Sequence, residues 1–167
     1  MNKLIFLTLA LLIGASLFIW SGVYNIAAND EHWTITNKLI DVLRERSIEV
    51  RAEEITVPDN LNDVSRIASA ALNYEVMCSQ CHLAPGTETT ELYEGLYPQP
   101  PVFYQTDEEH EEHGEQNNFW VIKNGIKLTG MPAWGASHTD DEIWSLVVFI
   151  GQLSEMTAEE YQKQVAD

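Results

Sequence analysis

The stretch NYEVMCSQCHLAP, residues 73–85, contains both cysteines of the chain. Cys78 and Cys81 are three positions apart, and His82 follows the second cysteine directly. On a helical turn, residues at i and i+3 share one face, so we expect the two thiols to lie side by side. The stretch therefore offers two neighbouring thiols and an imidazole for one purpose.

A helix is predicted to lead into this stretch. From Asn62 the apolar residues recur at helical spacing as far as Cys78, with Asn62 or Asp63 as the N-cap. This context disfavours a thioredoxin-like redox motif, because that motif follows a strand and opens a helix. A structural zinc site is disfavoured because it needs two further ligands and the chain has no third cysteine.

The pattern C-x-x-C-H is typical of covalent c-type haem attachment. In such a site each thiol adds to one haem vinyl group, and the adjacent imidazole binds the iron. The sequence therefore predicts one covalently bound haem c, attached through Cys78 and Cys81 and ligated by His82.

Together with GIKLTGMPAWG, residues 125–135, the CSQCHLAP motif resembles a class I c-type cytochrome over about residues 62–153. The resemblance implies an all-α fold, a helical wrap around one haem, with His82 and a distant methionine as axial ligands of the iron. It also implies that the carbonyl group of Pro85 accepts a hydrogen bond from the His82 ring and fixes the orientation of the imidazole.

Met131 is the methionine that fits the second axial position. Met1 belongs to the apolar N-terminus, Met77 adjoins the first cysteine, and Met156 lies beyond the last core helix. In the family that the chain resembles, a Gly-Met-Pro loop of this kind presents its sulfur atom to the iron. The rival ligand is His138, which we expect at the surface.

The N-terminus is apolar over a length that can cross a membrane. Lys3 is its one charged residue, and the apolar stretch runs from Leu4 to about Tyr24. At about 1.5 Å per helical residue it reaches roughly 30 Å, the thickness of a bilayer core. We expect residues 1–28 to be an uncleaved transmembrane anchor. The alternative is a secretory signal, cleaved near the small residues at 26–28.

The chain is strongly acidic, with a formal net charge of −17. Residues 52–122 hold fourteen acidic side chains and one basic side chain, which argues against nucleic acid as a partner because phosphate contacts need Lys and Arg clusters. Redox proteins with basic surfaces are the natural complement. By the positive-inside rule, Lys3 stays in the cytoplasm, so the acidic part faces the periplasm from a bacterial inner membrane.

We expect four parts in the chain. Its 167 residues, 45% of them hydrophobic, suit one globular domain of about 100 to 150 residues and an appendage. Residues 1–28 form the anchor, 29–60 an amphipathic helix and linker, 61–155 the cytochrome c domain, and 156–167 a C-terminal tail with a short helix.

The linker is richer in basic residues than the acidic part that follows. Its apolar positions at helical spacing are Ile35, Leu39, Val42 and Leu43. They predict a helix over residues 34–47, capped by Thr34 or Thr36, and then an extended segment to Pro58. We expect this part to be a spacer packed on the domain; the alternative is a docking element for a membrane partner.

Two helices are predicted after the haem motif. QNNFWVIKNG, residues 116–125, predicts a short helix that ends at Gly125. In SHTDDEIWSLVVFIG, residues 137–151, Thr139 and Glu142 predict a capping box for the last core helix. The side chains expected to face inward are Phe119, Trp120 and Ile122 of the first helix and Ile143, Leu146, Val147 and Ile150 of the second. The aromatic residues expected where the last helix crosses the attachment helix are Tyr74, Trp144 and Phe149.

Two loops carry further hypotheses. GLYPQPP, residues 95–101, is a proline-stiffened loop for which passage along a haem edge and a plain structural role stay open. The residues that would then cover the ring are Tyr97, Pro98 and Pro100. TDEEHEEHGEQ, residues 106–116, is interpreted as a solvated acidic loop; the alternative is a divalent-cation site at His110 and His113.

These features predict a membrane-anchored monohaem cytochrome c that carries single electrons between redox proteins of a respiratory chain. We do not expect an enzyme, since ligation by His and Met leaves no open position on the iron. One alternative is an integral haem subunit of a larger membrane oxidoreductase. Another is a haem enzyme or sensor whose Met131 is displaced by a ligand.

Overall fold

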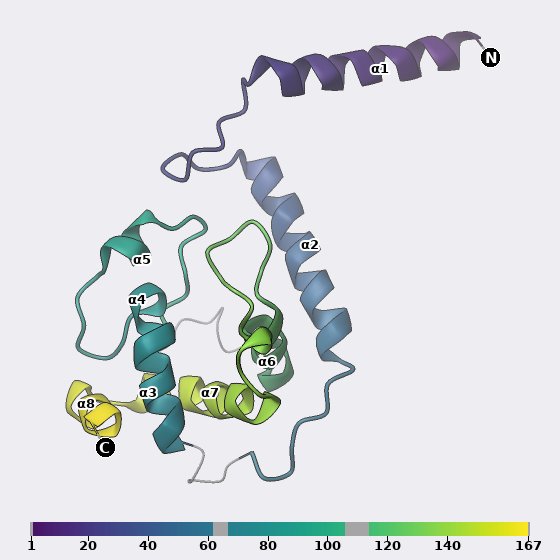
Figure 1. Cartoon of the computed structure of the whole chain (residues 1–167). Helices are drawn as coiled ribbons and strands as arrows, with labels where there is room; N and C mark the ends of the chain where they lie inside the picture. Colours follow the sequence, from purple (N-terminus) through teal and green to yellow (C-terminus); the bar gives the residue numbers. More distant parts are fainter. Residues whose placement is uncertain (1, 62–66, 106–113, 167) are drawn as a thin grey trace.

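The computed structural model describes residues 2–61, 67–105 and 114–166, and for residues 67 and 68 it describes the backbone alone. Within these ranges every regular element is helical, which confirms the predicted all-α fold (Figure 1). The predicted cap at Asn62 or Asp63, and His110 and His113, lie outside the described residues. The elements are α1 (Asn2–Ser21), α2 (Thr34–Ala52), α3 (Ile67–Met77), α4 (Ser79–His82), α5 (Glu91–Gly95), α6 (Glu115–Asn124), η2 (Trp134–Ala136), α7 (Asp140–Gln152), η3 (Leu153–Glu155) and α8 (Ala158–Ala166).

Helix α1 projects away from the other helices, and none of its residues is buried (Figure 1). Its mean hydropathy is 2.3 over an 18-residue window. Of the helices in the described ranges, it alone has the length and composition to cross a membrane. A membrane anchor and a signal sequence share these properties.

The core of the domain forms where α3 crosses α7 (Figure 1). Tyr74 of α3 and Phe149 of α7 meet there as predicted, with ring centroids 5.5 Å apart. Trp144, predicted for the same crossing, stacks instead on Phe119 of α6, with centroids 4.2 Å apart. The third helix of this core is α8, whose Tyr161 is fully buried against Tyr74 and Phe149. Helix α8, which lies in the segment expected as a C-terminal tail, thus contributes to the core through Tyr161.

Helix α7 begins and packs as its sequence predicts. The capping box is present, because the Thr139 hydroxyl accepts from the Glu142 N–H at 3.3 Å while a Glu142 carboxylate oxygen accepts from the Thr139 N–H at 2.8 Å. The apolar residues recur at i, i+3, i+4 and i+7, so they line one face and are buried together. They are Ile143, Leu146, Val147 and Ile150.

Helix α2 departs from its prediction in three respects. Its N-cap is Trp33, and no side chain caps it, so the prediction of Thr34 or Thr36 is wrong. The helix also continues to Ala52, past the predicted end at residue 47, because Ile48 and Ala52 are buried and their packing extends it. Third, the predicted apolar face points away from the domain and is exposed.

Candidate functional site

Cys78 lies where α3 ends and α4 begins. Its N–H donates to the Tyr74 carbonyl at 2.8 Å, and its own carbonyl accepts from the N–H groups of Cys81 and His82 at 3.0 and 2.8 Å. One helical turn therefore carries both thiols and the imidazole. Both cysteines are free and half-buried. Burial, with a smaller Coulombic contribution from Cys81, raises the pKa of the Cys78 thiol to about 12, so this thiol is protonated at neutral pH.

Leu83, directly after His82, has a left-handed backbone conformation that its packing and a hydrogen bond stabilise. Leu83 has a φ of 59°, a region that is unfavourable for a residue with a branched side chain. Its side chain is buried, and its carbonyl accepts a hydrogen bond from the Tyr74 hydroxyl at 2.7 Å. Tyr74 therefore holds the end of the motif against the helix that begins it. Burial is also the main cause that raises the pKa of Tyr74, so its hydroxyl stays a donor.

Pro85 occupies a turn rather than the imidazole site. The Thr87 N–H donates to the Ala84 carbonyl at 3.0 Å, and Pro85 and Gly86 are the two central residues. Gly86 has a φ of 82°, so the sequence Pro-Gly fits a type II turn. Pro85 therefore belongs to the turn that follows the motif.

The carbonyl that faces the imidazole is that of Pro101, with its oxygen 2.8 Å from His82 Nδ1. The prediction of Pro85 is therefore wrong, because the tight turn at Pro85 leaves this role to a proline nineteen positions after His82. A carbonyl oxygen only accepts, so Nδ1 carries the proton and donates. In this tautomer Nε2 carries the lone pair and is the nitrogen that can bind a metal.

The loop that brings Pro101 also covers His82. Phe103 stacks on the imidazole, with centroids 4.6 Å apart and an interplanar angle of 18°. At the other end of this loop, Tyr97 contacts the N-terminal part of the chain: its hydroxyl accepts from the His32 N–H and donates to Asn37 Oδ1, both at 3.1 Å. The loop thus runs from the start of α2 to the imidazole.

Met131 lies in the loop between α6 and η2. Its N–H donates to the Thr129 hydroxyl at 3.1 Å, and its carbonyl accepts from the Ile126 N–H at 3.2 Å. The side chain is half-buried and packs against the core. These bonds make the loop compact and fix the backbone from which the Met131 side chain extends.

Two glycines allow this loop to pack closely. Gly125 ends α6 as predicted, with a φ of 66°, and a Cβ there would lie 2.8 Å from the Met131 carbonyl oxygen. At Gly130, a Cβ would clash with the side chain of Leu96. Leu96 precedes Tyr97, so the methionine loop touches the loop that ends at Pro101. The methionine loop is therefore in contact with the loop that reaches His82, while the two cysteines and His82 lie on the turn after α3.

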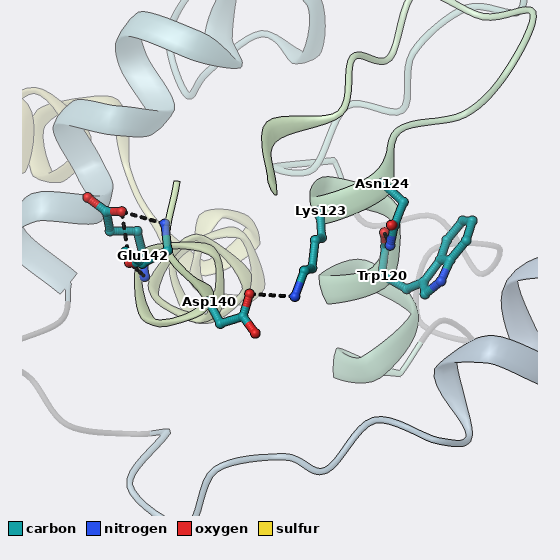
Figure 2. A network of polar contacts seen from close by, with 6 residues as sticks. Trp120, Lys123, Asn124, Asp140 and Glu142 are labelled. Atoms are coloured by element: carbon teal, nitrogen blue, oxygen red, sulfur yellow. Dashed lines mark hydrogen bonds and ion pairs between the residues drawn. The ribbon is translucent and has the colours of Figure 1, made fainter. Parts of the chain in front are cut away.

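Figure 2 shows a network of polar contacts at the start of α7 and at the end of α6, the helix that precedes the methionine loop. Lys123 Nζ lies 2.6 Å from an Asp140 carboxylate oxygen, which ties the two helices together. Beside it stand the Glu142 cap and, on α6, the Asn124 amide donating to the Trp120 carbonyl at 2.9 Å (Figure 2). Trp120 itself is half-exposed, although it was predicted to face inward.

The rival ligand, His138, lies in a polar setting. Its Nδ1 is 3.0 Å from the Ser137 hydroxyl, and its ring lies edge-on to Trp134, with centroids 5.6 Å apart. It is half-buried rather than at the surface as expected. In the ranges that the structure describes, no three His, Cys, Asp or Glu residues gather as a metal site.

The donor set fits a covalently attached haem. Two thiols on one turn, an imidazole whose Nε2 carries the lone pair, and a thioether in a compact loop are the groups that such a haem requires. The half-buried apolar side chains packed against the core include Phe103, Tyr104 and Trp134. Cys78, Cys81, His82 and Met131 would hold the haem, with Pro101 orienting the imidazole.

Sequence reasoning missed Pro101, Phe103 and the hydroxyl of Tyr74. The three prolines at positions 98, 100 and 101 indicate a rigid loop, but they do not show which carbonyl reaches the imidazole. The buried Tyr74 hydroxyl needed a partner, and only the fold shows that the partner is the Leu83 carbonyl.

Comparison with known protein families matches residues 65–150 to the family described as cytochrome C oxidase, cbb3-type, subunit III. The matched part runs from just before α3 to near the end of α7 and contains all the predicted ligands. No curated protein matches the chain.

Proposed function

We propose that this chain, which belongs to the family of cbb3-type cytochrome c oxidase subunit III, carries single electrons between redox proteins of a respiratory chain. Its cytochrome c domain, of a monohaem family, places the chain in respiratory electron transfer. The proposal adds that it acts as a carrier, not as an enzyme, and that α1 anchors it in the inner membrane with the haem domain in the periplasm.

The observation that carries the proposal is the fixed imidazole beside two thiols. Pro101 sets the tautomer of His82, Phe103 sets the plane of its ring, and α4 sets its position relative to Cys78 and Cys81. Bound haem iron cycles between its ferric and ferrous states and so carries one electron at a time. A thioether from Met131 as sixth ligand would close the site to substrates.

Anchoring is supported by the exposure and composition of α1. Every side chain of this helix is solvent-exposed in a helix of mean hydropathy 2.3, which is costly in water and favourable in lipid. Lys3 at its start favours a cytoplasmic N-terminus. A c-type domain after α1 then faces the periplasm.

The test measures both the covalent attachment of haem and the membrane location of the protein. In the full-length protein, haem should survive acid extraction, and replacing both Cys78 and Cys81 with Ala should abolish that resistance. The protein should stay with the membrane fraction through carbonate and high-salt washes. Acid-resistant haem in the double variant, or full extraction by carbonate, contradicts attachment and anchoring respectively.

A second candidate is a permanent subunit of a larger oxidoreductase, favoured by the oxidase subunit family to which the chain belongs. A permanent subunit copurifies with its complex in mild detergent at constant stoichiometry. A carrier separates from its partners as salt rises, because its acidic surface is attracted to basic ones through screened charges.

A further inference from the structure

One face of α2 is apolar, exposed and turned away from the domain. Its five members are 50–72% exposed, although their spacing is that of a helix face built for burial. We call this set the α2 stripe; it consists of Ile35, Leu39, Val42, Leu43 and Val50. Exposed apolar side chains gathered in this way mark a contact surface.

The domain contacts α2 from the other side. Ile48 and Ala52 are buried, and α2 packs against α6. Gln116 of α6 donates to the Ile55 carbonyl at 3.3 Å just after the helix ends. Nothing in the described parts of the chain covers the α2 stripe, and its partner must come from outside them.

The α2 stripe begins beside the proposed anchor. Trp33, the N-cap of α2, lies against Tyr24 and Phe18, with ring centroids 4.9 and 5.9 Å apart. Phe18 belongs to the last turn of α1, so aromatic contacts connect the two helices. In Figure 1, α2 forms the edge of the domain on the side toward which α1 extends. A bilayer around α1 would therefore lie next to α2.

Charge separates α2 from the rest of the domain. The helix carries four basic and three acidic residues, whereas residues 53–122 carry fourteen acidic residues and one basic residue. The side chain of Arg46 is 69% exposed and shares the face of the α2 stripe, where it pairs with Glu49 at 2.6 Å. An anionic lipid surface would attract this helix and repel the acidic faces.

We propose that α2 lies in the membrane surface, with the α2 stripe inserted among the lipids and the acidic part of the domain turned away from them. The proposal rests on anchoring by α1 and adds a second contact that fixes orientation. An amphipathic helix with apolar residues on one face and Lys or Arg beside them suits this interfacial position. Trp33 fits the headgroup level at the start of the helix.

Helix α2 is connected to the proposed haem site, so its orientation in the membrane also sets the orientation of that site. Asn37 on α2 accepts from the Tyr97 hydroxyl, and Tyr97 belongs to the loop that ends at Pro101 and His82. With α2 held in the membrane surface, the domain has one fixed orientation. The orientation of the haem relative to the membrane is then fixed, whereas a domain held by α1 alone would rotate freely.

The experiment measures membrane depth at single sites in the full-length, haem-loaded protein. The protein is reconstituted in vesicles of phosphatidylethanolamine and phosphatidylglycerol, with a nitroxide on one introduced cysteine: Val42→Cys in the α2 stripe, Leu12→Cys in α1, or Glu159→Cys. Glu159 belongs to α8, on the opposite side of the domain from α2 (Figure 1). The readout is the ratio of collision rates with oxygen, which concentrates in lipid, and with a water-soluble nickel complex.

The proposal expects a ratio several-fold higher at Val42 than at Glu159, and closer to that of Leu12. A ratio at Val42 equal to that at Glu159, with Leu12 in lipid, overturns the interfacial position and leaves anchoring intact. Water-like ratios at both Val42 and Leu12 contradict anchoring itself. Labelling of the protein without an added cysteine shows that Cys78 or Cys81 is free, which contradicts the proposed haem attachment.

A second measurement uses matched leucines. Leu43→Asp places a charge in the α2 stripe, and Leu72→Asp places one on the exposed face of α3; both side chains are more than half exposed, so neither change disturbs the core. In oriented membranes the linear dichroism of the haem should fall in Leu43→Asp and stay unchanged in Leu72→Asp. Equal dichroism in both overturns the proposal. Protection of the Val42 label in native membranes but not in purified vesicles shows that a protein covers the α2 stripe, and this too overturns it.

Discussion

Helices α7 and α2 both have an apolar stripe along one face, but the α7 stripe is buried and the α2 stripe is exposed. In α7, Leu146 of the stripe has no exposed surface, while in α2 the corresponding leucine Leu43 is 72% exposed. The other residues of the α7 stripe are also buried, and the other residues of the α2 stripe are also exposed. Both helices also pack on α6, but α7 does so through its apolar face and α2 through the opposite one.

The two stripes differ in whether other helices of the domain cover them. The α7 stripe is covered by α3 and α6, and its burial stabilises the folded domain. The α2 stripe contributes nothing comparable within the described residues, and the proposed insertion into the membrane surface would explain its apolar character. Substitutions in the two helices should therefore act on different properties.

The largest effect should come from matched leucine truncations. Leu146→Ala removes fully buried methyl groups and leaves a cavity, so the free energy of unfolding should fall by about 2 to 5 kcal/mol. Leu43→Ala should change it by less than about 0.5 kcal/mol, because its side chain is already in solvent. Chemical denaturation of the two variants in the same detergent measures both values. Similar losses would show that the α2 stripe stabilises the fold as the α7 stripe does, and would contradict the expected difference between the two helices.

A smaller effect is expected at α8, which tests whether the tail is part of the core. The Tyr161 hydroxyl donates to a Glu75 carboxylate oxygen at 2.5 Å, and burial, aided by that carboxylate, raises the pKa of Tyr161. Tyr161→Phe should lower the free energy of unfolding by about 1.5 kcal/mol. A double-mutant cycle with Glu75→Gln isolates the pair. Strictly additive losses would mean that the hydroxyl and the carboxylate do not interact.

The next effect concerns the start of α7. Thr139→Ala removes the N-cap and should cost about 1 kcal/mol at neutral pH. The backbone and side-chain hydrogen bonds from Thr139 lower the pKa of Glu142. A carboxyl group whose pKa is lowered on folding stabilises the fold above its ordinary pKa, and this contribution is lost as pH falls through the lowered value.

The capping box of α7 also predicts which carboxyl group contributes to the pH dependence of stability. Glu142→Gln should remove this part of the acid dependence of stability, while Asp141→Asn, next to it but outside the box, should retain it. Thermal melts between neutral and acidic pH compare the two variants. An unchanged acid dependence in Glu142→Gln would exclude the capping box as its source.

Local patterns predicted those elements whose interactions are local or whose chemistry is specified by spacing. The capping box, the end of α6 at Gly125 and the buried stripe of α7 depend on residues within two helical turns of one another, and all three are confirmed. The cytochrome c family was predicted from the C-x-x-C-H spacing and the later Gly-Met-Pro loop, and the family match confirms it.

The errors concern contacts between distant segments. The resemblance to class I c-type cytochromes implies Pro85 as the acceptor for His82, but Pro85 lies in a Pro-Gly turn and the Pro101 carbonyl takes this role. For α2, periodicity identified the apolar face and could not say whether protein or membrane covers it. The length of α2 was underestimated because burial of Ile48 and Ala52 overrides the weak propensity of the segment that follows residue 47.

The central claim is that His82 and Met131 close the iron of an electron carrier, and the absorption spectrum of Met131→Ala tests it most directly. The oxidised wild-type protein should show the weak far-red sulfur-to-iron charge-transfer band of a thioether-ligated haem. Met131→Ala should lose the band, bind carbon monoxide when reduced, and have a lower reduction potential, since a thioether favours ferrous iron more than water does. Met156→Leu, a near-isosteric change of a methionine outside the loop, should keep all three properties. A band that persists in Met131→Ala, or that is missing from the wild-type protein, would contradict the ligand assignment and reopen the site to enzymatic or sensory chemistry.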